Sequence, residues 1–151
     1  MLSESMRPFV QIATVCRMFL NDTSGSVSII QIMERVLIHG LTDEMQHTPL
    51  GQLAIVVILK SGEMRGKWNW SITTETPSKK RLPGPQMSAL FEGDERGVMF
   101  ASPIGLVAEE EGLYWFDVML EQALLTRIPL RVIYQKVQPI PAAGLQPPPL
   151  G

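Results

Sequence analysis

The sequence predicts an all-β domain, specifically an immunoglobulin-like antiparallel β-sandwich of seven or eight strands. Turn-forming stretches interrupt apolar segments of about ten residues, a spacing typical of sandwiches and barrels. These stretches are residues 21–25, 47–51, 61–63, 76–85, 92–97 and 109–112. Several segments between them alternate apolar and polar residues, as strands with one buried face do. Their β-branched and aromatic side chains also favour strands.

Two strands are predicted in the first quarter of the chain, over residues 8–20 and 26–38. Alternation in the first strand gives one face made of Val10, Ile12, Thr14, Cys16 and Met18. The second segment also fits a helix, because its apolar residues have helical spacing and Ser28 and Gln31 resemble a capping box. The preceding glycine and the β-branched residues favour a strand.

Three further strands are predicted in the middle of the chain. Residues 53–59, LAIVVIL, are apolar at every position, which indicates a central strand covered on both faces. Residues 67–74 alternate cleanly, and the polar side chains between Trp68, Trp70 and Ile72 place these three on the core side. Residues 97–102 form a short strand.

Residues 112–132, GLYWFDVMLEQALLTRIPLRV, are predicted to form the hairpin that closes the sandwich. One face of its first strand is the better core face, and it carries Tyr114, Phe116, Val118 and Leu120. The other face carries Trp115, Asp117 and Met119. Helical spacing is also present in this stretch, but Pro129 limits any helix because it removes a backbone donor and clashes with the preceding turn.

The order of these elements resembles a family of uncharacterised bacterial proteins described only as a domain of unknown function. The resemblance rests on residues 25–36, 53–59 and 110–132. It implies a small single-domain β-sandwich, and it implies no known activity, so no functional residue is transferred. Family members usually carry an acidic residue and glycine in the closing turn, where this chain has Glu121, Gln122 and Ala123. The missing glycine predicts a longer or bulged turn rather than a two-residue turn with positive φ.

Length and composition suit one domain in the cytoplasm. We expect a flexible N-terminus over residues 1–6, a folded domain over 7–137 and a Pro-rich flexible tail over 138–151, which is a conceivable ligand for another domain. The chain has 1 cysteine, no recognisable signal peptide and no apolar run long enough for a membrane. A net charge of −2 with one short basic run, Lys79–Arg81, argues against nucleic-acid binding.

No constellation of residues indicates an enzyme, a cofactor or a metal site. Cys16 lies within a predicted strand and is expected to be a buried thiol rather than a nucleophile. His39 and His47 flank Asp43 and Glu44, but their spacing matches no zinc pattern, and the predicted interpretation is a polar loop. The chain has no phosphate-binding loop and no serine elbow.

One alternative is a ligand-binding sandwich that uses its loop end. If successive strands alternate in direction, loops 39–50, 77–85 and 103–111 lie at one end. That end would gather acids suited to calcium, namely Asp43, Glu44, Glu109, Glu110 and Glu111. The basic run in the second loop could instead neutralise them. Carbohydrate is the other candidate ligand, through stacking on Trp68 and Trp70, although alternation places both tryptophans in the core.

The preferred hypothesis is a non-enzymatic protein-binding or assembly module. Trp115 and Met119 are predicted to lie on an outward surface, because the opposite face of their strand is the better core face. Exposed apolar patches on a sandwich often mark interfaces. The partner is then an unknown protein or a second copy of the chain, and a loop or the tail covering both residues is the competing explanation.

Overall fold

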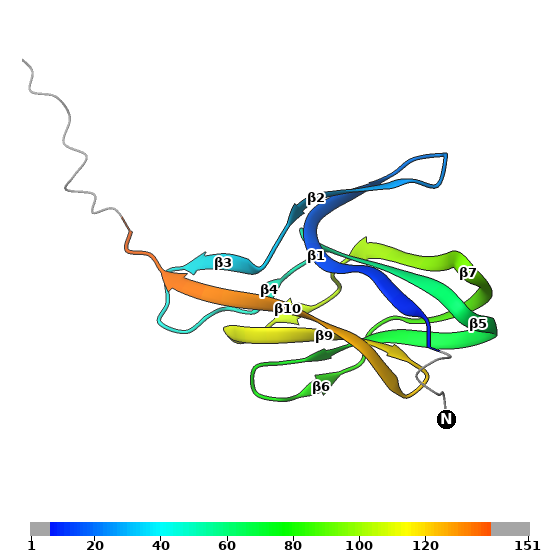
Figure 1. Cartoon of the computed structure of the whole chain (residues 1–151). Coiled ribbons are helices and arrows are strands. Elements are labelled where there is room, and N and C mark those ends of the chain that lie inside the picture. The colour runs from blue at the N-terminus through cyan, green and yellow to red at the C-terminus, as the bar shows by residue number, and fades with distance from the viewer. Residues whose placement is uncertain (1–6, 140–151) are drawn as a thin grey trace, which may run out of the picture.

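The computed structural model describes residues 7–139, and every regular element in this range is a β-strand (Figure 1). The all-β prediction is confirmed. The strands are β1 (Phe9–Asn21), β2 (Val27–Ile32), β3 (Arg35–Gly40), β4 (Thr48–Pro49), β5 (Ala54–Glu75), β6 (Arg81–Leu82), β7 (Gln86–Pro103), β8 (Val107–Ala108), β9 (Gly112–Leu120) and β10 (Ala123–Lys136). Within this range, no helix has the length and apolar character needed to cross a membrane. The predicted flexible N-terminus and nearly all of the predicted tail lie outside the described residues.

One large sheet contains most of the strands. Its order is β2-β1-β5-β9-β10-β3, with β6 and β7 also paired to β5, while β4 and β8 form a separate small sheet. All pairs are antiparallel except β3 with β10, which is parallel. The prediction of a purely antiparallel fold is therefore wrong at this edge. The segment predicted as one strand over 26–38 is broken at residues 33–34, and the chain after the break pairs with the far end of the sheet.

Two long bent strands, β5 and β7, fold the sheet over on itself. Residues 61–63 and 92–97 were expected to be turns, but they lie opposite each other within the β5–β7 pair, where Gly62 faces Asp94. Glycines with positive φ at positions 62, 66 and 93 allow both strands to bend together without losing their pairing. The predicted strands 53–59 and 67–74 are thus halves of β5, and 97–102 belongs to β7. The first half of β5 pairs with β1, and its second half pairs with β9.

Two apolar clusters cover the two faces of the first half of β5. The main core includes Ile55 and Val57 together with the inward faces of β9 and β10. A second, smaller cluster contains Cys16, Ala54 and Val56, against which Phe19 and Ile29 pack. The prediction that 53–59 is covered on both sides is therefore confirmed. Cys16 is fully buried as predicted, and burial raises the pKa of its thiol.

A bulge in β1 changes which face its first residues occupy. The register with β5 shifts between Val10 and Ile12, so Val10 packs against the main core while Cys16 belongs to the second cluster. The predicted common face from Val10 to Met18 is therefore wrong at its start. A bulge inserts one residue on one strand and so moves the following side chains to the other face.

The closing hairpin is present as β9 and β10, and the helical alternatives for this stretch and for 28–40 are wrong. Its predicted core residues are all buried, namely Tyr114, Phe116, Val118 and Leu120. The turn, however, is a two-residue turn, because Leu120 pairs with Ala123 and Glu121 has a φ of 50°. Two hydrogen bonds join Glu121 to the backbone of Asn69. The backbone N–H of Glu121 donates to the Asn69 carbonyl oxygen at 2.8 Å, and the backbone N–H of Asn69 donates to Oε1 of Glu121 at 3.1 Å. The bulge follows later, between Leu124 and Thr126.

Two substitutions of Glu121 separate the contribution of its side-chain hydrogen bond from the strain of its positive φ. Glu121→Ala removes the side-chain hydrogen bond but keeps a Cβ at positive φ, so we expect the free energy of unfolding to fall by about 1 kcal/mol. Glu121→Gly also removes that bond, but it relieves the left-handed strain, which costs about 1–2 kcal/mol in non-glycine residues. The glycine variant should therefore be the more stable of the two in urea denaturation. An alanine variant as stable as the glycine variant would contradict this account.

Candidate functional site

Trp115 and Met119 lie on the outward face of β9, where both are partly buried. The guanidinium of Arg127 covers the Trp115 ring, with its central carbon 4.6 Å from the ring centroid. Asp117 lies between the two residues on the same face. These two predicted interface residues are therefore separated by an ionic side chain, and they do not form one continuous apolar patch.

Asp117 is the centre of an ion-pair network that sequence reasoning missed. Its side chain is 4% exposed, and its two oxygens accept hydrogen bonds of 2.7 Å from Arg81 and Arg127. Arg127 also donates to Glu75 at 2.8 Å, and the hydrogen bonds that it donates to Asp117 and, to a lesser extent, to Glu75 raise the pKa of Arg127. The network ties β5, β6, β9 and β10 together. The available signal was an aspartate in the middle of an apolar strand with an arginine on the facing strand of the hairpin.

Among residues 7–139, the pair of neighbouring strands with the most exposed large apolar residues is the β1–β2 hairpin, here called the arm. In Figure 1 the arm projects beyond the β5 and β7 ribbons. Phe19 and Ile29 pack against the second cluster. Four apolar side chains of the same hairpin are 36–68% exposed, and they are here called the arm surface: Met18, Leu20, Ile30 and Ile32.

The outer edge of the arm is an unpaired strand. Among the described strands, β2 pairs only with β1, so its second edge is free. Its sequence, VSIIQI, contains no charged residue and no proline. Edge strands in natural proteins usually carry such residues because a free edge can pair with another chain. The arm therefore combines a free strand edge with an exposed apolar surface.

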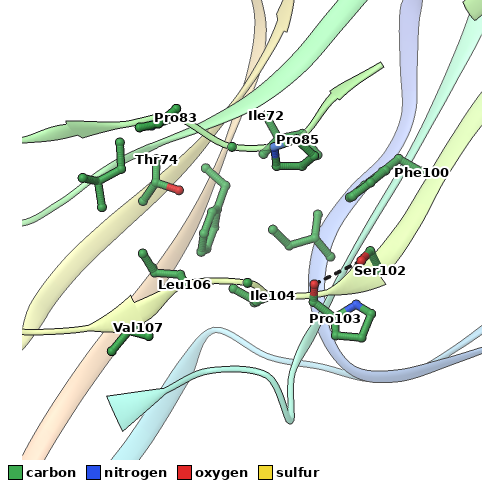
Figure 2. Close-up of a pocket in the computed structure, with 15 residues that line it drawn as sticks. Ile72, Thr74, Pro83, Pro85, Phe100, Ser102, Pro103, Ile104, Leu106 and Val107 are labelled. Carbon is green, nitrogen blue, oxygen red and sulfur yellow. Dashed lines mark hydrogen bonds between the residues drawn. The ribbon is translucent and has the colours of Figure 1, made fainter. Parts of the chain in front are cut away.

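A pocket of about 570 Å³ opens between the two halves of the folded sheet, here called the interlayer pocket (Figure 2). One rim is the segment 82–85 before β7, and the other is the segment 102–107, which contains the end of β7 and the residues after it. Ile55, Ile72 and Phe116 of the main core line its interior. The lining is apolar except for the hydroxyls of Thr74 and Ser102 and backbone groups.

The three predicted loops do meet at one end of the fold. Their residues line a smaller recess next to the interlayer pocket, including His47, Lys80 and Glu109. Of the five acids, only Glu109 and Glu110 line this recess. Asp43 pairs with Lys136 at 2.6 Å, and Glu110 accepts a hydrogen bond from the Ser78 amide. That hydrogen bond lowers the pKa of Glu110. Across residues 7–139, no three histidine, cysteine or acidic residues are placed to hold a metal ion.

The remaining candidate residues are separated from one another. His39 interacts with Gln135 at 3.2 Å, whereas His47 lines the recess. Trp70 is buried in the main core as predicted, and Trp68 is partly buried with its ring nitrogen donating to the Arg65 carbonyl. The two tryptophans therefore do not present a shared exposed face to a sugar.

Comparisons with protein-family models and with curated proteins found no match. The resemblance to the bacterial family stays a prediction, and the functional conclusions below rest on the geometry of the arm and of the interlayer pocket.

Proposed function

We propose that the protein is a non-enzymatic assembly module whose arm binds a second copy of the chain. The observation that carries this proposal is the arm surface, four exposed apolar side chains on a hairpin that is tied to the second cluster by Phe19 and Ile29. Burying apolar area contributes about 25 cal/mol per Å², so such a surface favours association.

A second copy is the partner that fits the edge of β2 best. Two β2 strands can pair antiparallel about a two-fold axis, which is the commonest symmetry of homodimers. Because β2 contains no charge, the strand meets its own copy without like-charge repulsion. Pairing would satisfy the free backbone groups of both edges and bring the two arm surfaces into one continuous apolar face.

The rest of the fold acts in this proposal as a rigid support for the arm. We interpret the folded-over sheet as an immunoglobulin-like sandwich to which the parallel β3 strand has been added, and we place the assembly in the cytoplasm. Trp115 and Met119 are a less favoured interface, since Asp117 and Arg127 interrupt that face.

Light scattering after gel filtration tests the proposal. We expect the wild type to have twice the 16.8 kDa chain mass at micromolar concentration. Ile32→Asp, at an exposed arm position, should weaken dimerisation by at least about tenfold, because it places two charges in an apolar interface. Leu90→Asp is the matched control, since Leu90 is a 57% exposed strand residue outside the arm and its replacement should leave the dimer intact.

Other results would assign the surface differently. A wild type that stays monomeric at about 100 μM would contradict self-association, because the dissociation constant would then lie well above 100 μM and the binding free energy would be weaker than about −5.5 kcal/mol. If the dimer persists in Ile32→Asp but dissociates in Trp115→Ser, the proposal that the arm forms the interface is contradicted. The interface would then lie on the outward face of β9.

A further inference from the structure

We propose that the interlayer pocket binds a neutral, mostly apolar small molecule that carries one hydrogen-bonding group. This site is separate from the arm and does not depend on the assembly function. Its volume of about 570 Å³ lies within the range of natural small-molecule sites, about 300–1,000 Å³.

The lining of the interlayer pocket selects against charge. No ionisable side chain lines it, and most of its lining residues are aliphatic residues, prolines, Phe100 and Phe116. A carboxylate or an ammonium group entering this space would lose its hydration without meeting an opposite charge. Lys80, Glu109 and Glu110 line the neighbouring recess instead, so a ligand held in the interlayer pocket itself is expected to be uncharged.

Both rims of the pocket are fixed to the sheet, so the space is preformed. On one side, Pro85 accepts a hydrogen bond from the Ile72 amide at 3.1 Å. Gly84 lies so close to β5 that an added Cβ would be 1.9 Å from the Ile72 carbonyl oxygen. On the other side, the Ile104 amide donates to the Leu53 carbonyl at 2.9 Å. Rigid rims reduce the ordering cost of binding a ligand.

Thr74 supplies the one directional contact. The residue is 7% exposed, and its hydroxyl takes part in none of the hydrogen bonds found among residues 7–139. Figure 2 shows this hydroxyl pointing into the space between the rims, whereas the Ser102 hydroxyl is bonded to the Pro103 carbonyl at 3.2 Å. This hydroxyl is accessible from the pocket, since it is not one of the fully buried atoms without a partner, and it can bond to whatever occupies the space.

The rims also disfavour a peptide strand as the occupant. Pro83, Pro85 and Pro103 line the opening, and proline has no backbone N–H to donate. A peptide that adds to a sheet edge needs alternating donors and acceptors along that edge. A small molecule needs only the apolar walls and the single hydroxyl.

The neutral dye Nile red, whose carbonyl oxygen can accept a hydrogen bond, is a suitable probe. We expect saturable binding to the full chain with blue-shifted fluorescence. Leu106→Trp, which fills the pocket, should weaken binding by at least about tenfold, because the dye loses its apolar contacts. Thr74→Val keeps the shape but removes the hydroxyl, and should weaken binding by about threefold to tenfold, the value of one net hydrogen bond.

Ile32→Asp is the control for dye bound to the arm, and it should leave the affinity unchanged. Circular dichroism and thermal denaturation establish whether each variant is folded. If Leu106→Trp does not fold, the dye affinity of the isosteric Thr74→Val variant decides the test. Wild-type fluorescence that does not saturate would overturn the proposal, as would equal affinity of folded Leu106→Trp. Loss of binding in Ile32→Asp would also overturn it, because the dye would then occupy the arm. Unchanged affinity in Thr74→Val would overturn the assigned hydrogen bond.

Discussion

Replacing Asp117 with asparagine is expected to lower the free energy of unfolding by about 2–4 kcal/mol. Removing one partner of a fully buried ion pair costs about 3–5 kcal/mol, and the effect is smaller here because the two arginine side chains are 51% and 34% exposed. Asparagine retains the shape of the side chain but removes the charge shared by Arg81 and Arg127. Its amide group would also point donors at an arginine, which has no acceptor. Urea denaturation followed by circular dichroism measures the change.

Asp43→Asn is the matched control for this prediction. Asp43 also forms an ion pair, with Lys136 at 2.6 Å, but its side chain is 88% exposed. Exposed pairs contribute little, so the control should change stability by less than about 0.5 kcal/mol. Equal effects of the two variants would mean that the burial of Asp117 adds nothing. A large effect confined to Asp117 supports a network that locks β9 and β10 to β5 and β6.

Alternation in the sequence predicted the inward faces of the central strands correctly. The core side of β9 and the burial of Trp70 and Ile72 follow from a period of two along one strand, which is local information. The double coverage of 53–59 was also predictable, because a run without any polar residue has no face suited to water. These features required no knowledge of which strands are neighbours.

The long bent strands were not predictable in the same way. Glycine and acidic residues at 61–63 and 92–97 favour a hairpin turn and a bend within a strand equally. The difference lies in the register, because these two stretches face each other across β5 and β7. The parallel pairing of β3 likewise depends on where the chain crosses after β2, which no local pattern specifies.

The candidate sites show the same limit. The outward position of Trp115 followed from alternation, but its cover by Arg127 comes from a neighbouring strand. The arm surface was assigned to strands without any sign that it would be exposed, because exposure there depends on β1 extending past β5. The interlayer pocket is formed by segments on both sides of β7, and only the folding of the sheet brings them together.

Gly97→Ala is expected to destabilise the protein by about 3 kcal/mol, the upper part of the range for overpacking a well-packed site. An added Cβ at Gly97 would lie 2.2 Å from the backbone oxygen of Leu59, and a backbone atom within a sheet cannot move aside as a flexible side chain can. The two strands would have to separate where β7 enters its second half, next to the bend that folds the sheet.

Gly105→Ala is the control, since an added Cβ at Gly105 meets nothing within 4 Å. This variant should be neutral or more stable by up to about 1 kcal/mol, because alanine lowers the conformational entropy of the unfolded chain. Thermal and urea denaturation of both variants give the comparison. Equal stability of the two would show that β5 and β7 can shift apart at little cost, and the bent pair could not then be the rigid element that holds the two halves of the sheet together.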